Sequence, residues 1–246
     1  MKRKYFGLAI GAFVIALSGC SASLNAHNPT DAKLGVEWMQ SSGEYDALSY
    51  QAFNTAKQAF LKNKVKGKNA VVVDLDETMI NNSAYAAWQV KNNKSYSPES
   101  WNQWCEAREA TEIPGAVDFA NFVVKNGGDM FYVSNRKQKV YDATVDNLKA
   151  LNFPQVDAKH ILLKEKSSDK ASRINKILKD GYKVVLMVGD NLNDFGSDVY
   201  HKTNKERVAY VKTHKNNYGT KWIMLPNPNY GGFQTSDLSI KPWSGK

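Results

Sequence analysis

The chain has 246 residues, of which 42% are hydrophobic, and carries 33 Lys and Arg against 24 Asp and Glu. This length suits one domain with an insertion. The formal charge of +9 raises the question of nucleic-acid binding, but the lysines are dispersed among acids, without a basic block or a zinc-finger spacing. We therefore expect no nucleic-acid polymer as a partner; an excess of positive charge also attracts small anions such as phosphate esters.

The first twenty residues have the pattern of a bacterial secretory signal. Lys2-Arg3-Lys4 is followed by an apolar stretch from Leu8 to Leu17, too short to span a bilayer comfortably. The next residues, Leu17-Ser18-Gly19-Cys20, resemble the lipobox of bacterial lipoproteins. We predict a signal peptide over residues 1–19 and lipidation of Cys20. The alternative is an ordinary signal peptide with a chance cysteine.

Residues 20–30 would then be a lipidated tether, and residues 31–246 the folded domain. Several acyl chains on one cysteine anchor a protein stably, whereas one chain binds only marginally. Ser21, rather than Asp, after the cysteine resembles the sorting signal for the outer membrane, so we expect export and anchoring there. With Cys20 acylated, Cys105 has no partner for an internal disulfide, and its role stays open.

Helical periodicity runs from Asp31 to about Asn63, with a break near Gly43 that predicts two helices. A basic loop over 64–68 leads to a predicted strand at 70–75. Residues 79–113 follow it and are aromatic without strand-like alternation: Tyr85, Trp88, Tyr96, Trp101 and Trp104. We predict that this insertion and the N-terminal helices form a smaller, mainly helical cap.

Helices and strands alternate through the rest of the chain. The predicted helices span 116–125, 138–151 and 168–179, and the predicted strands span 129–134, 160–164, 183–189 and 222–225. The β-branched apolar runs at 71–73 and 184–188 are typical of strands buried on both faces of a parallel sheet. The alternation predicts an α/β fold built on a doubly wound parallel sheet.

Carboxylates follow two of these strands: Asp74 and Asp76 come after the first, and Asp190 and Asp194 after the strand at 183–189. In open α/β sheets, ligands bind beyond the carboxyl ends of the strands. Four converging carboxylates repel one another unless a cation is present, and hard oxygen ligands favour Mg²⁺. The pattern predicts Mg²⁺-dependent phosphoryl transfer; a Ca²⁺ loop would need a different ligand rhythm.

The residue types at these positions suit defined chemical roles. A carboxylate can attack phosphorus and form an aspartyl phosphate, which makes Asp74 the candidate nucleophile. Asp76 can protonate the leaving oxygen and then activate water. Ser134, with Asn135 and Arg136, offers a hydroxyl and backbone amides to the phosphoryl oxygens, the alternative being a turn with a surface arginine.

Another basic residue, Lys170, lies near the start of the predicted helix at 168–179. Lys170 can neutralise charge that develops on the phosphoryl group and hold the nucleophile. A solvated lysine is the alternative, because this chain has many.

The motifs at Asp74 and Asp76, Ser134, Lys170, and Asp190 with Asp194 resemble, in order and placement, those of the haloacid dehalogenase (HAD) superfamily. Further segments resemble the class C acid phosphatases, bacterial outer-membrane lipoprotein 5′-nucleotidases with a DDDD signature. These segments are the lipobox at Cys20, Gly43-Glu44-Tyr45, Trp101-Asn102-Gln103-Trp104 and 225–232.

The resemblance implies a HAD-like, Rossmannoid core. It implies Mg²⁺ held by the carboxylates of Asp74 and Asp190 and the backbone carbonyl of Asp76, with Asp194 acting through water or supporting the site. It also implies hydrolysis of phosphomonoesters, commonly nucleoside 5′-monophosphates and nicotinamide mononucleotide. The leaving-group ring would stack on Trp101 and Tyr230, and the chain would form a homodimer.

Two other functions stay open from the sequence. One is a surface haem-binding or adhesin lipoprotein, for which the four histidines give thin support because no axial-ligand motif accompanies them. The other is a nucleoside phosphotransferase, which would use the same aspartyl phosphate with an alcohol in place of water.

Overall fold

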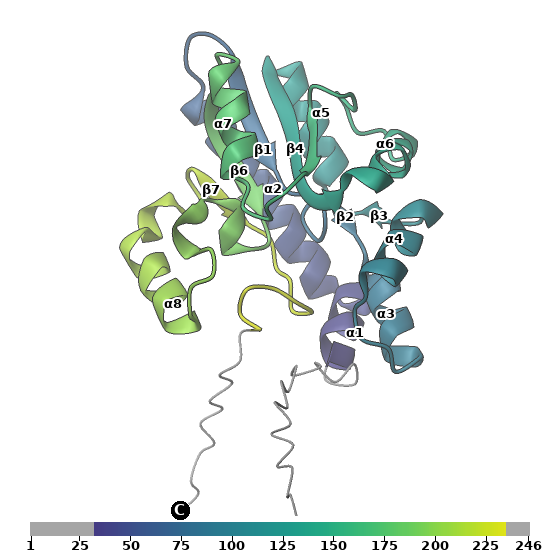
Figure 1. The fold of residues 1–246 in the computed structure, drawn as a ribbon. Coiled ribbons are helices and arrows are strands. Elements are labelled where there is room, and N and C mark those ends of the chain that lie inside the picture. The colour runs from purple at the N-terminus through teal and green to yellow at the C-terminus, as the bar shows by residue number, and fades with distance from the viewer. Residues whose placement is uncertain (1–31, 235–246) are drawn as a thin grey trace, which may run out of the picture.

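The structure is a computed structural model that describes residues 32–234. The predicted signal peptide, Cys20 and the tether lie outside the described residues. Five parallel strands form the central sheet in the order β5-β4-β1-β6-β7 (Figure 1). Their bounds are Ile161–Lys164 for β5, Gly128–Lys137 for β4, Asn69–Val73 for β1, Lys183–Gly189 for β6 and Trp222–Met224 for β7. The predicted α/β fold is thereby confirmed.

The sheet order places a topological switch between β1 and β6. From β1 the chain continues to β4 and β5 on one side, whereas from β6 it continues to β7 on the other. A crevice opens beyond the carboxyl ends of the two strands that flank such a switch. The two strands that end in carboxylates are therefore the two that border the crevice.

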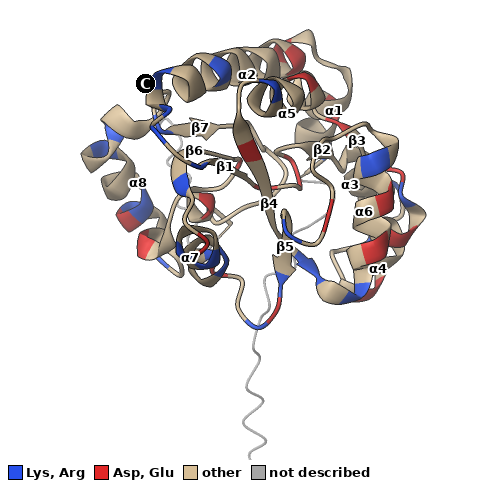
Figure 2. Cartoon of the chain, turned by 90° about the horizontal axis from the view of Figure 1, so that it is seen from above, with Lys and Arg blue, Asp and Glu red and all other residues tan. Residues whose placement is uncertain are grey.

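Helices cover both faces of the sheet. Helices α2 (Gly43–Asn63) and α5 (Ala116–Lys125) lie together on one face, and α7 (Ala171–Lys179) lies on the other (Figure 2). Val71 and Val73 of β1 belong to the larger core cluster with the α2 and α5 side chains, whereas Ala70 and Val72 belong to the smaller cluster beneath α7. This alternation explains why β1 is apolar at every position.

The segment between β1 and α5 holds two helices framed by a short ribbon. Strands β2 (Ile80–Asn81) and β3 (Thr111–Glu112) pair antiparallel, and α3 (Ser83–Lys91) and α4 (Pro98–Ala107) lie between them. Helix α1 (Lys33–Ser41) packs against α3 (Figure 1). Ser42 separates α1 from α2 and accepts a hydrogen bond from the Tyr45 N–H as the α2 N-cap.

Several element bounds differ from the sequence predictions. Strand β4 continues to Lys137, so the motif at Ser134 lies within the strand rather than after it. Helix α7 begins at Ala171, so Lys170 is its N-cap and not a residue of its first turn. The predicted helix at 138–151 begins as a 3₁₀ turn at Gln138–Val140, and the regular helix α6 spans Tyr141–Ala150.

One helix was not predicted at all. Helix α8 (Asn204–Thr213) has no single apolar face, so periodicity gave no signal. Its start carries a capping box, in which Thr203 accepts from the Glu206 N–H and Glu206 accepts from the Thr203 N–H. The Thr-x-x-Glu spacing was the missed signal. Across residues 32–234, no helix has both the length and the apolar character needed to cross a bilayer.

Candidate active site

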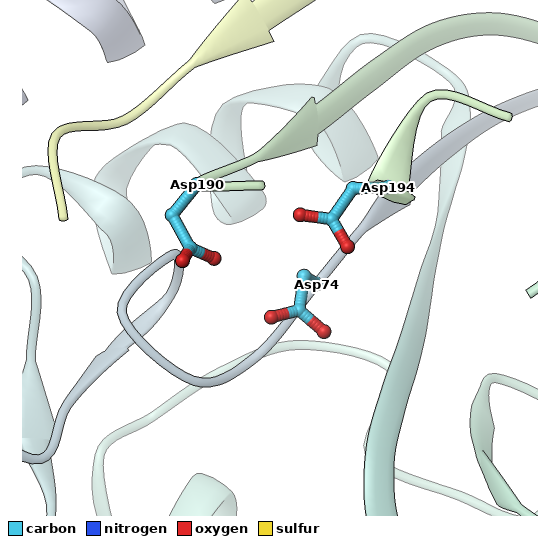
Figure 3. A group of neighbouring side chains, drawn as sticks. All are labelled: Asp74, Asp190 and Asp194. Carbon is cyan, nitrogen blue, oxygen red and sulfur yellow. The ribbon is translucent and has the colours of Figure 1, made fainter. Parts of the chain in front are cut away.

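Three carboxylates converge at the crevice between β1 and β6 (Figure 3). Asp74 follows β1, and its backbone N–H donates to the Val188 carbonyl at 3.0 Å, which extends the sheet to this residue. Asp190 follows β6, and Asp194 ends the 3₁₀ turn Leu192–Asp194. One oxygen from each of the three lies within 4.8 Å of the others. The structure thus brings together three of the four predicted metal ligands through their side chains.

A glycine allows this close approach. An added Cβ at Gly189 would lie 2.4 Å from atoms of the Asp194 side chain, far inside van der Waals contact. Asp194 in turn accepts from the Asn191 N–H at 2.9 Å, which fixes its carboxylate over the end of β6. The Gly-Asp-x-x-x-Asp spacing therefore has a steric reason as well as a chemical one.

Lys170 is the cation at the centre of the site. Its buried ammonium donates to Asp74 Oδ1 and to Asp194 Oδ1, the latter at 2.8 Å. Burial alone would lower the pKa of Lys170, but the carboxylates of Asp194 and Asp74 raise it above its ordinary value. One lysine therefore pairs with two of the three clustered carboxylates, so the negative charges of the cluster outnumber the positive charge beside them.

Two carboxyls of the cluster have raised pKa values, with burial as the largest cause. Burial raises the pKa of Asp74 well above its usual range, against the opposing effect of Lys170. Burial and the Asp194 charge raise the pKa of Asp190 to about 7, although Asn227 at 2.8 Å and Thr78 at 2.9 Å donate to its oxygens. A donor set of clustered carboxylates short of positive charge fits a hard divalent cation.

Asp76 has different partners from the other three aspartates. Arg136 donates to Asp76 Oδ1 from Nε at 2.9 Å and from Nη2 at 2.8 Å, and Asn82 donates to the same oxygen at 3.0 Å. Asp76 Oδ2 has only the Ser134 hydroxyl, at 3.3 Å. The Asp76 side chain is therefore held mainly through Oδ1, and Asp76 also lines the pocket described below.

Ser134 and the two residues that follow it differ in burial and in contacts. Ser134 is fully buried, and Asn135 is exposed at the pocket. The Arg136 guanidinium is buried against Asp76 and beneath the Trp101 ring, with 5.7 Å from Cζ to the ring centroid. Arg173 braces the motif by donating to the Ser134 carbonyl at 2.6 Å and to Asn135 Oδ1 at 2.8 Å.

A cavity of about 660 Å³ lies above these groups. Its lining includes two groups of side chains: an acidic group with its lysine, Asp74, Asp76, Lys170, Asp190 and Asp194, and an aromatic group, Tyr85, Tyr96, Trp101 and Tyr230. The Trp101 ring meets the Tyr85 ring edge to face, with centroids 5.2 Å apart. Tyr230 reaches the cavity from the loop after β7. The two predicted ring contacts, Trp101 and Tyr230, thus line the same cavity as the aspartates.

Sequence reasoning gave no role to several residues of the site. Thr78 and Asn227 orient Asp190, Asn82 holds Asp76 together with Arg136, and Arg173 braces β4. Glu77 is buried, and burial raises its pKa well above the usual range, with the charges of Asp76 and Asp190 adding to the effect. Thr78 was visible as the end of the Asp-x-Asp-x-Thr motif, whereas the other contacts join distant segments.

Within residues 32–234, the histidines and the free cysteine lie outside the three-aspartate cluster. The His160 ring packs against Phe131 and contacts Asp157 at 2.8 Å, and the His214 ring stacks on Tyr210. Among the described residues, the only group of three or more His, Cys, Asp or Glu side chains close enough to share a metal ion is the aspartate cluster. Cys105 is buried, and burial raises the pKa of its thiol to about 12.

Comparison with known families agrees with this site. Residues 21–233 match the model of the HAD superfamily, subfamily IIIB (acid phosphatase). The chain belongs to this family. The class of protein defined by the fold and the four aspartates is therefore the HAD acid phosphatases.

Solved structures and curated proteins show the same relationship. The chain is 37% identical to a class C acid phosphatase from Bacillus anthracis, with a TM-score of 0.78 over 82% of this chain and 86% of that one. A second structure of a Bacillus anthracis class C acid phosphatase, with tungstate bound, has a TM-score of 0.79 at 33% identity, over 87% and 98% of the two chains.

Plant proteins match at lower identity. Vegetative storage protein 1 of Arabidopsis thaliana is 28% identical over 69% of this chain, and acid phosphatase 1 of Solanum lycopersicum is 25% identical over 66%. The match spans 66% and 65% of the lengths of these two relatives.

Proposed function

We propose that this chain is a Mg²⁺-dependent phosphomonoesterase that hydrolyses nucleoside 5′-monophosphates, nicotinamide mononucleotide and related esters. The observation that carries the proposal is the convergence of Asp74, Asp190 and Asp194 around Lys170, with Asp76 beside them, in the lining of one cavity. Bound by these carboxylates, Mg²⁺ would supply positive charge toward the phosphoryl oxygens.

In the first half-reaction, an Asp74 oxygen attacks phosphorus and the bond from phosphorus to the leaving oxygen breaks. Lys170 holds Asp74 Oδ1, so Oδ2 is the attacking atom. The leaving oxygen takes a proton from Asp76 Oδ2, the oxygen that Arg136 does not hold. The products are an aspartyl phosphate at Asp74 and the free alcohol.

In the second half-reaction, water attacks the phosphorus of the aspartyl phosphate. Asp76 Oδ2 takes the proton from the water, and the bond between phosphorus and the Asp74 oxygen breaks. Inorganic phosphate leaves and the Asp74 carboxylate is restored. The Lys170 ammonium lies beside the transferred group in both steps and stabilises the charge on its oxygens.

The aromatic side chains in the cavity lining support ring-bearing leaving groups. Trp101 and Tyr230 offer flat aromatic rings to the cavity. Offset stacking on such a ring is worth about 0.5–1.5 kcal/mol beyond burial and tolerates many bases. This part of the lining therefore suits nucleotides of different bases and the nicotinamide ring.

The test compares the full chain with Asp74→Asn, in buffer with Mg²⁺, on adenosine 5′-monophosphate, p-nitrophenyl phosphate and glycerol 1-phosphate. An amide is not a nucleophile toward phosphorus, so we expect turnover to fall at least about 1,000-fold on all three substrates. Asp142→Asn makes the same chemical change at an exposed position on α6 and is expected to keep wild-type turnover. Normal turnover by Asp74→Asn would contradict the nucleophile.

We propose, too, that the chain is exported and anchored to the bacterial outer membrane through lipid on Cys20. The basic start, the short apolar stretch and the Leu-Ser-Gly-Cys sequence support this. Metabolic labelling with radioactive palmitate, followed by membrane fractionation, tests it. Cys20→Ser should lose the label and the anchoring; a labelled Cys20→Ser protein would overturn the proposal. The homodimer stays a prediction.

A further inference from the structure

Glu77 is buried beside the cavity, and its carboxyl has no role in the proposed reaction. It directly follows Asp76, is 1% exposed and has a φ of +60°. A non-glycine residue takes up this left-handed conformation only at a cost, which the surrounding structure must offset. Its two oxygens have separate partners: Oε1 accepts from the Asn82 N–H at 2.9 Å, and Oε2 accepts from the Tyr230 hydroxyl.

The loop that carries Tyr230 contacts the site through Asn227 as well as through the Tyr230 hydroxyl. Asn227 Oδ1 accepts from the Asn229 N–H at 3.0 Å and from the Tyr230 N–H at 3.3 Å, which gathers the turn. The other end of the same amide donates to Asp190 Oδ2 at 2.8 Å. The turn at 227–230 is thus fixed to Asp190 through Asn227 and to Glu77 through the Tyr230 hydroxyl.

The Tyr230 side chain is only partly enclosed by its neighbours, since it is 41% exposed. The side chain rotates about two bonds, and the contact of its hydroxyl with Glu77 fixes the direction in which the ring points. A ring that is already oriented binds a flat ligand without a further loss of conformational entropy.

We infer that Glu77 is a positioning residue that fixes the Tyr230 ring for stacking against the leaving group. The inference rests on the proposed phosphomonoesterase function and adds to it a determinant of selectivity for ring-bearing esters. Glu77 shares a loop with Asp74 and Asp76, so the ring-binding wall and the reacting carboxylates have a common support. The role needs only the acceptor oxygen of Glu77, not its participation in the reaction.

The experiment measures kcat and KM of the full chain with Mg²⁺ for adenosine 5′-monophosphate, which carries a ring, and glycerol 1-phosphate, which does not. Tyr230→Phe removes only the hydroxyl, and Glu77→Ala removes its acceptor. Each should lower the ratio of kcat/KM for the nucleotide to that for glycerol 1-phosphate about five- to tenfold, through KM rather than kcat. The double variant should lose no more than either single one.

Two further variants separate positioning from a general structural effect. Glu77→Gln keeps an oxygen for the Asn82 N–H and an amide that can donate to the Tyr230 hydroxyl, so it should restore most of the ratio. Tyr50→Phe removes an exposed tyrosine hydroxyl on α2 and should leave the ratio at the wild-type value.

The inference is overturned if Tyr230→Phe keeps the wild-type ratio, if the two losses multiply in the double variant, or if Glu77→Gln behaves as Glu77→Ala. Should Glu77→Ala fail to fold, Tyr230→Phe and Glu77→Gln decide the matter, since both leave the loop backbone and its Asn82 contact in place. A wild-type chain that hydrolyses neither ester would refute the proposed function. Wild-type turnover with unchanged ratios in the variants would refute only the role of Glu77.

Discussion

The acidic and the aromatic side chains that line the cavity come from different parts of the fold. Asp74 and Asp190 extend from the central strands. Trp101 and Tyr96 come from the segment inserted between β1 and α5, and Tyr230 comes from a loop after the last strand. Under the proposed function, the first group, which we call the phosphate end, is placed by the core, and the second, which we call the ring end, by segments added around it.

The phosphate end and the ring end also differ in how strong their interactions are. Charges interact strongly in the buried end, because little water screens them there. Under the proposed function, half-exposed rings such as Tyr230 would contribute by stacking, at about 1 kcal/mol each. Substitutions at the phosphate end should thus change turnover by orders of magnitude. Substitutions at the ring end should change the ratio of kcat/KM between substrates by no more than one to two orders of magnitude.

The largest effect is expected from loss of the metal. Chelation, or Asp190→Asn, should lower turnover at least about 1,000-fold, because the carboxylates then repel both one another and the phosphoryl oxygens. In the wild type, Mg²⁺ should raise the melting temperature, since an ion that binds only the folded state stabilises it by about 2.7 kcal/mol at 100 times its Kd. Asp190→Asn should lose this rise while Asp142→Asn keeps it. Full activity after thorough chelation would remove the metal from the mechanism.

Lys170→Met is expected to have the next largest effect. It leaves Asp74 and Asp194 buried without their cation, and breaking such a pair costs about 3–5 kcal/mol of unfolding free energy. Turnover should fall about 100-fold with the lost charge stabilisation. Urea titration and steady-state kinetics measure the two losses. Lys176→Met, at an exposed position of the same helix, should change neither. A fully active, equally stable Lys170→Met chain would make Lys170 a bystander.

The same division explains what could be predicted from the sequence. The four aspartates and Lys170 stand beside apolar runs or helix starts, so local pattern places them at the edge of a parallel sheet. The contacts between Asn227 and Asp190 and between Tyr230 and Glu77 join segments more than thirty and one hundred residues apart. They depend on how a loop without periodicity packs, and no local pattern encodes that.

Arg136 shows the limit of motif reading within the phosphate end itself. Its position beside Ser134 predicted a contact with the phosphoryl group, and the structure adds a contact that the motif did not predict, between the guanidinium and Asp76. Because β4 continues through the motif, Ser134 and Arg136 are two residues apart in one strand and lie on the same face, where both contact Asp76. A predicted strand that ended at residue 134 did not give this direction.

The smallest expected effect belongs to the ring end. Trp101→Ala should lower kcat/KM for adenosine 5′-monophosphate relative to glycerol 1-phosphate about fivefold, because one stacking surface is lost while the carboxylates stay in place. Trp88→Ala is the matched control: Trp88 is half-exposed and stacks on Tyr85 at 5.8 Å but does not line the cavity. An equal loss for both esters in Trp101→Ala would mean that Trp101 acts by holding Arg136, which packs beneath its ring, against Asp76. In that case the division between a catalytic end and a selective end would fail at this residue.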